Sequence, residues 1–198
     1  MIAGVILAGG AGTRIGGNKA LAPLRGRTLI DAVMARARDQ VGTLALSVPT
    51  VGADAYRARF EGHYPLLFDA LADAGPLAGV VAGLEWAVRG NASWLATFPC
   101  DTPFLPRDLV AQLMREANDA PVAARHAGRL HGVCTVWPVS CLERLRVDVG
   151  RGQLRSLHGA LDHLGGTIRD IDASPDAFFN INTPDDLARA EAMAANDP

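Results

Sequence analysis

The chain has 198 residues, of which 49% are hydrophobic and 20% charged, and its formal net charge is −2 at pH 7. This length is typical of one domain with a substantial buried core, so we expect a single domain over residues 1–198. The near-neutral charge provides no basic field of the kind that drives sequence-independent nucleic-acid binding, which excludes nucleic acid as an expected partner.

Short apolar runs alternate with helical patterns along the first hundred residues. The pattern predicts strands at residues 2–8, 43–48, 65–68 and 94–98, and helices at residues 28–39, 53–60 and 76–88. This alternation predicts an α/β fold, with a mostly parallel central sheet and helices on both faces.

The pattern changes after residue 98. A loop at residues 99–106 and a helix to about residue 118 precede two strands, at residues 121–125 and 130–137, which predict a hairpin added to the sheet. Further helices are predicted near residues 140–146 and 152–164, and a strand near residues 167–171. A closing helix begins at Pro184, with Thr183 as its cap.

A glycine-dense loop follows the first strand, and from Leu7 to Lys19 the chain reads LAGGAGTRIGGNK. Glycines let backbone N–H groups approach phosphate oxygens, while Arg14 and Lys19 supply positive charge, so the loop predicts a triphosphate site. The dinucleotide fingerprint needs glycine at position 15, which is Ile15, and the Walker motif needs Gly-Lys-Ser/Thr, so neither fits. A flexible turn with incidental basic residues is the structural alternative.

Acidic residues follow two of the predicted strands. Ligands of a doubly wound sheet bind at the carboxyl ends of its strands, and Asp69 and Asp101 come at two of these ends. Magnesium prefers oxygen ligands, usually one or two carboxylates together with phosphate oxygens, so Asp101 is the predicted Mg²⁺ ligand. The alternative for Asp101 is a turn residue, because Asp-x-Pro sequences also start turns.

A triphosphate, a metal ion and a lysine together indicate attack on the α-phosphorus, with pyrophosphate as the leaving group. No protein nucleophile is needed, because catalysis would depend on positioning and charge neutralisation. We expect Arg14 to face the β- and γ-phosphates and Lys19 to face the α-phosphate.

Two other groups of residues give weaker signals. His126, His131 and Cys134 are disfavoured as a metal cluster because they straddle the predicted hairpin. The basic run at residues 144–155 is either a contact for an anionic acceptor or a solvated helix face.

The cysteines and the apolar runs indicate the compartment. Cys100, Cys134 and Cys141 show no Cys-x-x-Cys spacing and are odd in number, which argues against a zinc ribbon or a disulfide framework. No apolar run approaches the roughly 20 residues that span a bilayer. We therefore expect a soluble cytoplasmic protein that does not bind membranes.

Four motifs, in this order along the chain, resemble those of the molybdenum cofactor guanylyltransferase family. They are Leu7-Ala8-Gly9-Gly10 with Arg14, Gly16-Gly17 and Lys19; Gly75-Pro76-Leu77-Ala78-Gly79; Pro99-Cys100-Asp101-Thr102-Pro103-Phe104; and Phe179-Asn180-Ile181-Asn182-Thr183-Pro184. The first motif alone marks the wider nucleotidyltransferase superfamily, whereas all four together are specific to the family.

The resemblance implies a Rossmann-like nucleotidyltransferase fold and transfer of GMP from Mg-GTP to molybdenum-bound molybdopterin. It implies a nucleotide-binding part at about residues 1–106 and an acceptor-side part at about residues 107–198, with molybdoenzymes or their chaperones as candidate recipients of the product. The residues implied to bind GTP are Leu7, Ala8, Gly9, Gly10, Lys19, Asp69 and Asp101, with Asp101 also on Mg²⁺, while Asn180 and Asn182 would line the acceptor side.

The sequence departs from the family at Asn18, at Ser47 and at His131-Gly132, where the family commonly has His-Pro. Asn18 stands where the family often has Asp, and Ser47 stands near the position of an Asn-x-Asn turn. Transfer of another base, transfer to a sugar phosphate, and nucleotide binding without catalysis therefore stay open. The presence of both Lys19 and Asp101 argues against the last of these.

Overall fold

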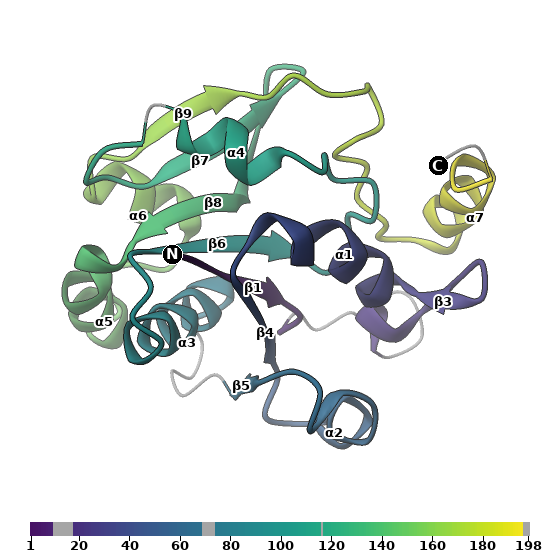
Figure 1. The fold of residues 1–198 in the computed structure, drawn as a ribbon, viewed down its shortest axis with the longest axis horizontal. Coiled ribbons are helices and arrows are strands. Elements are labelled where there is room, and N and C mark those ends of the chain that lie inside the picture. The colour runs from purple at the N-terminus through teal and green to yellow at the C-terminus, as the bar shows by residue number, and fades with distance from the viewer. Residues whose placement is uncertain (10–17, 69–73, 116, 196–198) are drawn as a thin grey trace.

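The computed structural model describes residues 1–9, 18–68, 74–115 and 117–195 (Figure 1). Its centre is a seven-stranded sheet in the order β5-β4-β1-β6-β8-β7-β9. The strands are β1 (Ile2–Leu7), β4 (Thr43–Val48), β5 (Leu66–Phe68), β6 (Trp94–Pro99), β7 (Val122–His126), β8 (Arg129–Pro138) and β9 (Thr167–Asp170). Among these strands only β8 runs antiparallel to its neighbours, so the predicted mostly parallel α/β sheet is confirmed.

The centre of the sheet explains where the loops meet. β1 pairs in parallel with β4 and β6, and Leu7 at its end lies opposite both Ser47 and Pro99. The interior of β1 is buried, which is why it reads as a continuous apolar run rather than an alternating one. The chain therefore leaves β1 and β6 side by side at the carboxyl edge of the sheet.

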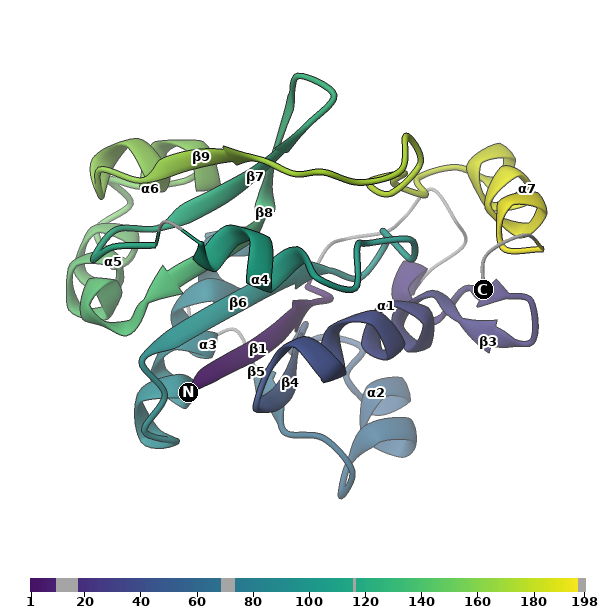
Figure 2. The same cartoon turned by 45° about the horizontal axis from the view of Figure 1, so that its top comes forward.

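Helices cover both faces of the sheet (Figures 1 and 2). They are α1 (Leu29–Ala37), α2 (Asp54–Phe60), α3 (Pro76–Arg89), α4 (Leu109–Met114), α5 (Leu142–Gly150), α6 (Leu157–His163) and α7 (Pro184–Met193), with 3₁₀ turns η2 (Lys19–Leu21), η3 (Arg38–Gln40) and η4 (Val139–Cys141). Side chains of α1, α2 and α4 share one buried core, and those of α3, α5 and α6 share another on the opposite face. None of the described helices is long and apolar enough to cross a bilayer.

Two predicted helix starts are confirmed by their caps. The Thr183 side chain accepts a hydrogen bond from the Asp186 N–H at the start of α7, and Thr28 does the same for Asp31 at the start of α1. Each aspartate side chain accepts in return from the cap backbone, which completes a capping box.

The structure contains one hairpin that the sequence did not predict. β2 (Pro23–Leu24) and β3 (Arg27–Thr28) pair across a two-residue turn, in which Arg25 and Gly26 have φ angles of 47° and 80°. Positive φ at both turn positions matches the right-handed twist of a hairpin, but Arg-Gly is not a typical sequence for that turn.

Two predicted helices are shorter in the structure. α4 ends at Met114 rather than near residue 118, and the Asn118 side chain accepts a hydrogen bond from the Ala120 N–H beyond the helix. α6 begins at Leu157 rather than at Gly152, because Ser156 caps the helix and Gly152 has a φ of 70°.

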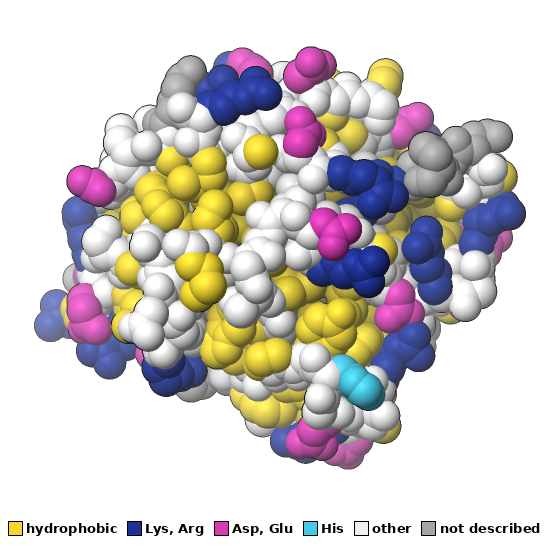
Figure 3. Space-filling model, in the orientation of Figure 1, with side chains coloured by type: hydrophobic (Ala, Val, Ile, Leu, Met, Phe, Trp, Pro, Cys, Tyr) yellow, Lys and Arg dark blue, Asp and Glu magenta, His cyan; other side chains and the backbone are white. Residues whose placement is uncertain are grey.

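A small third core joins the two ends of the chain. Leu24 and Leu29 from the first part pack with Ile181 and Ala190 from the last, so α7 lies beside the β2-β3 hairpin (Figure 2). This packing brings residues 180–182 next to the segment that carries Lys19. On the face shown in Figure 3, basic and acidic side chains are interspersed among apolar ones, in keeping with the small net charge.

Candidate active site

Lys19 is the centre of a polar cluster at the carboxyl edge of the sheet. Its Nζ donates to Oδ2 of Asp101 at 2.6 Å, to Oδ1 of Asn182 at 2.6 Å and to Oδ1 of Asn180 at 3.4 Å. The expected meeting of Lys19 and Asp101 is therefore confirmed, and both predicted acceptor-side asparagines join them. The roles of these four residues remain predictions.

Local packing explains why residues so distant in sequence converge. The Ile181 N–H donates to the backbone carbonyl oxygen of Asp101 at 3.0 Å, and the Ile181 side chain is fully buried. With Ile181 anchored in the third core, the side chains before and after it, Asn180 and Asn182, both contact Lys19. This backbone hydrogen bond joins the loop after β6 to residues 180–182.

The start of α7 fixes the position of Asn182. Oδ2 of Asp186 accepts from the Asn182 N–H at 3.0 Å and from the Thr183 N–H at 2.9 Å. These hydrogen bonds hold the pKa of Asp186 below its usual value, with the bond from Asn182 contributing most. The second aspartate of the Asn-Thr-Pro-Asp-Asp sequence therefore orients a residue of the cluster.

The Lys19–Asp101 pair is largely shielded from solvent, since the two side chains are 13% and 18% exposed. Asp101 also accepts a 3.3 Å hydrogen bond from the Thr102 hydroxyl. Every acceptor facing the Lys19 ammonium is an oxygen, which is the donor type that hard divalent cations prefer. The cluster is therefore suited to holding positive charge beside a phosphate chain.

The described residues contain no group of three His, Cys, Asp or Glu side chains placed to bind one metal ion. The rings of His126 and His131 instead stack on Phe178, with centroid distances of 5.2 and 4.3 Å. Among the described residues, Asp101 therefore belongs to no such cluster, and phosphate and water are the usual further ligands of Mg²⁺.

Cys100 lies next to Asp101 but is not placed to act as a nucleophile. Burial, together with the nearby Asp101 carboxylate, raises the pKa of the Cys100 thiol to about 12. The thiol is therefore protonated at neutral pH, and only the thiolate is reactive.

Several predicted residues are not in the described part of the chain. Gly10 and Arg14 fall within residues 10–17, and Asp69 falls within residues 69–73. Leu7 is described at the end of β1, and Ala8 donates its N–H to the Ser47 carbonyl oxygen at 2.8 Å. The assignment of these residues to nucleotide binding stays a prediction.

The arginines of α5 lie away from the cluster. β8 is antiparallel to β6, so Pro138 at its end pairs with Trp94 at the start of β6, and α5 follows at the amino edge of the sheet. Figures 1 and 2 both show α5 far from α7. Arg144 contacts His163, and Arg146 contacts Glu143. The interpretation of Arg144 and Arg146 as an acceptor contact is wrong, and a solvated face fits them.

Two residues near the site were not understood from the sequence. Ser47 is buried beneath α3, where a Cβ on Gly79 would lie 2.6 Å from the Ser47 Oγ. Tyr56 is fully buried, and its hydroxyl donates to Oδ1 of Asn18. In sequence, Tyr56 is indistinguishable from an ordinary core aromatic residue of an amphipathic helix.

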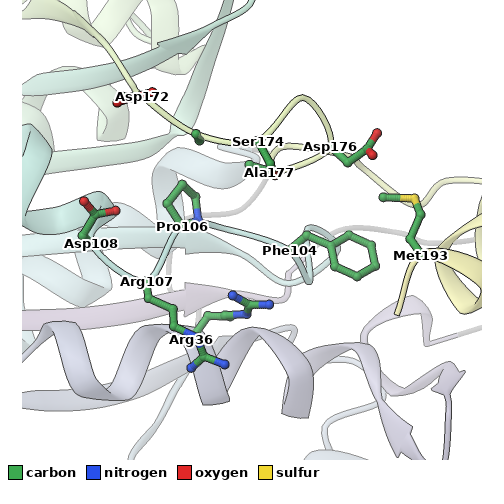
Figure 4. Close-up of a pocket in the computed structure, with 11 residues that line it drawn as sticks. Arg36, Phe104, Pro106, Arg107, Asp108, Asp172, Ser174, Asp176, Ala177 and Met193 are labelled. Atoms are coloured by element: carbon green, nitrogen blue, oxygen red, sulfur yellow. The ribbon is translucent and has the colours of Figure 1, made fainter. Parts of the chain in front are cut away.

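A separate groove of about 570 Å³ lies between α1, the loop after β6, residues 172–177 and the end of α7 (Figure 4). Its lining includes both basic and acidic side chains, among them Arg36, Arg107, Asp108, Asp172 and Asp176. None of the four cluster residues lines this groove. Because both signs of charge are present, its lining does not define an anion site.

The sheet order, the glycine loop after its first strand and the Lys19–Asp101 cluster at its carboxyl edge define a nucleotidyltransferase. Residues 4–165 match the family model described as a MobA-like NTP transferase domain. The chain therefore belongs to this family, and the resemblance stated from the four motifs is confirmed.

Comparisons with individual proteins agree. The chain is 42% identical over 196 residues to a molybdenum cofactor guanylyltransferase from Cereibacter sphaeroides, covering 98% of this chain and 97% of the relative. The structure of molybdopterin-guanine dinucleotide biosynthesis protein A from Archaeoglobus fulgidus superposes with a TM-score of 0.78 at 24% identity, covering 98% of this chain and 99% of that one. A Mycobacterium tuberculosis protein in complex with manganese superposes with a TM-score of 0.67 at 20% identity, covering 96% and 98%. The two structures have the same fold as this chain.

Proposed function

We propose that the protein transfers GMP from Mg-GTP to the terminal phosphate of molybdenum-bound molybdopterin, releasing pyrophosphate. The observation that carries the proposal is the convergence of Lys19, Asp101, Asn180 and Asn182 at the carboxyl edge of the sheet. Family membership and the similarity to the Cereibacter molybdenum cofactor guanylyltransferase support the choice of reaction.

Lys19 is the residue for which the structure supports the most specific role. Its ammonium group has three N–H donors, and each has one of the three acceptors described above. The 3.4 Å bond to Asn180 is the longest and so the weakest. We expect an α-phosphate oxygen to replace Asn180 at Lys19, which leaves the Asn180 amide available to the acceptor phosphate.

Asp101 has two roles in this proposal. In the structure it neutralises Lys19 at 2.6 Å, and with nucleotide present it would hold Mg²⁺ through its carboxylate. The bound ion would neutralise charge that develops on the phosphate oxygens. Asn182 would keep Lys19 aligned through its own 2.6 Å contact. The manganese complex of the Mycobacterium relative supports a divalent ion, and magnesium is our specific choice.

The remaining residues are assigned by position along the chain. Leu7, Ala8, Gly9 and Gly10 would bind GTP, Arg14 would face the β- and γ-phosphates, and Asp69 would lie at the nucleotide. We retain a nucleotide-binding part at about residues 1–106 and an acceptor-side part at about residues 107–198. The cluster supports this division, since Lys19 and Asp101 come from the first part and both asparagines from the second.

We also propose that the protein acts in the cytoplasm and passes its product to molybdoenzymes or their chaperones. Cys100, Cys134 and Cys141 are free thiols, as is usual in a reducing compartment.

Pyrophosphate release tests the proposed function. Purified protein with Mg²⁺ and molybdopterin acceptor is given GTP, CTP, ATP or UTP, and we expect release with GTP alone. Asp101→Ala should reduce release by about 100-fold or more, because the charge stabilisation at the phosphates is lost. Asp162→Ala on the exposed surface of α6 is the matched control and should retain full activity.

The other outcomes are equally informative. Release with CTP would keep the fold and chemistry but change the base. If no nucleotide gives pyrophosphate release with a verified acceptor, the result would favour a sugar-phosphate acceptor or a nucleotide-binding role without catalysis.

A further inference from the structure

Helix α2 buries a tyrosine whose hydroxyl group requires a hydrogen-bond partner. Tyr56 is fully buried, and a buried hydroxyl without a partner costs free energy. Its Oη donates to Oδ1 of Asn18 at 2.5 Å and lies 3.5 Å from the Ala8 carbonyl oxygen. Burial raises the pKa of Tyr56, so the phenol stays protonated and remains a donor.

These two partners come before and after the glycine loop in the sequence. Ala8 follows β1 and is held to β4 by its 2.8 Å bond to the Ser47 carbonyl oxygen. Asn18 directly precedes Lys19. One buried hydroxyl from α2 therefore contacts residues at both ends of the loop sequence.

Asn18 also starts the turn that carries Lys19. Its carbonyl oxygen accepts from the Leu21 N–H at 3.0 Å, the first hydrogen bond of η2. Its side chain makes no cap bond to that turn and bonds instead to Tyr56. The backbone of Asn18 thus begins the turn that carries Lys19, while its side chain is bonded to the buried Tyr56 of helix α2.

We propose that Tyr56 is a positioning residue of this enzyme: through Asn18, its buried hydroxyl holds the Lys19 turn in the place from which Lys19 reaches the nucleotide. This inference rests on the proposed function, in which Lys19 binds the α-phosphate. Asn18, which stands where the family often has Asp, suits this role. Its amide oxygen accepts the tyrosine hydrogen bond without adding a negative charge beside the triphosphate.

The test compares two tyrosine variants. Tyr56→Phe removes the hydroxyl and keeps the ring, while Tyr64→Phe makes the same change at the only other tyrosine of the chain. The dissociation constant for Mg²⁺-GTP is measured by calorimetry without acceptor, and kcat is measured with acceptor. For Tyr56→Phe we expect a lower kcat and a dissociation constant about threefold to tenfold higher. That increase corresponds to the loss of one hydrogen bond. Tyr64→Phe should match the wild type.

A double-mutant cycle separates positioning from general stability. Asn18→Ala removes the same bond from its other side, so the double variant should bind Mg²⁺-GTP no more weakly than either single variant. Asn18 is exposed, so Asn18→Ala removes no apolar packing and tests the same hydrogen bond even if Tyr56→Phe does not fold. Additive losses in the cycle, or a lower melting temperature with unchanged binding and kcat, would overturn the proposal.

A ligand-free measurement keeps the inference distinct from the proposed function. The N–H groups of Leu21 and Ala22 bond to the carbonyl oxygens of Asn18 and Lys19, so their hydrogen exchange reports on the turn. We expect exchange about threefold faster or more in Tyr56→Phe, and unchanged exchange refutes the positioning role. A wild-type protein that binds no Mg²⁺-GTP would refute the proposed function instead.

Discussion

Gly79 is the described glycine at which an added methyl group would meet the shortest contact. It faces the end of β1 from helix α3, and a Cβ there would lie 2.6 Å from the Ser47 Oγ and 2.9 Å from the Leu7 Cδ2. An ordinary contact begins near 3.4 Å, so either the Ser47 and Leu7 side chains turn away or α3 moves outward by up to about 0.8 Å at this point. Leu77 and Val80, which are fully buried beside it, would lose packing.

We expect Gly79→Ala to lower the free energy of unfolding by about 1–3 kcal/mol, the usual cost of overpacking a core. For a chain of this size that corresponds to a melting temperature lower by roughly 2–12 °C. Urea unfolding and thermal melting measure both quantities. Because Leu7 precedes the glycine loop, weaker binding of Mg²⁺-GTP should accompany the loss.

The matched control is Gly150→Ala at the end of α5, where nothing lies within 4 Å of the added Cβ. Alanine is the better helix former by up to about 1 kcal/mol, so this variant should be as stable as the wild type or slightly more stable. In the double variant with Ser47→Ala, the shortest contact disappears. The double variant should therefore lose less free energy of unfolding than the two single variants lose in sum. A Gly79→Ala protein with wild-type stability would refute the packing argument.

Three further predictions concern the cluster and the effect of pH. Asp186→Asn should weaken the α7 cap and lower kcat by releasing Asn182, whereas Asp185→Asn in the same turn, outside the capping box, should leave both unchanged. Burial, with the nearby Arg129 and His126, lowers the pKa of His131 to about 4 from 6.5. The unfolded chain therefore takes up the proton first, and stability should fall as pH drops from about 6.5 to about 4. Urea unfolding at pH 7 and pH 5 should show a smaller difference for His131→Phe, and an equal difference would contradict this. Chelation of divalent ions should abolish pyrophosphate release, and Asp101→Asn should need more Mg²⁺ for half-maximal rate than the wild type.

Much of the fold follows from local sequence. Residues 43–48 are a strand as predicted, because their apolar run suits a buried parallel strand. Thr183 with Asp186 three residues later marks the start of α7 through short-range hydrogen bonds alone. The hairpin predicted from the strands at residues 121–125 and 130–137 is β7-β8, and Ala127 and Gly128 in its turn both have positive φ.

The sequence by itself also singled out Lys19 and Asp101, through the glycine loop and positions after strands, and Asn180 and Asn182, through the family resemblance of their motif. The contact among these four residues does not follow from local sequence. It depends on β1 and β6 being neighbours and on Ile181 packing with Leu24 and Leu29.

Only the tertiary structure decided three further points. It assigned the Tyr56 hydroxyl to Asn18, it placed the arginines of α5 at the far edge of the sheet, and it showed that Gly79 faces Ser47. In each case the partner is distant along the chain, so no local propensity or periodicity encodes the contact. The physical reason is that side-chain neighbours across elements depend on strand order and helix packing, which the whole chain determines together.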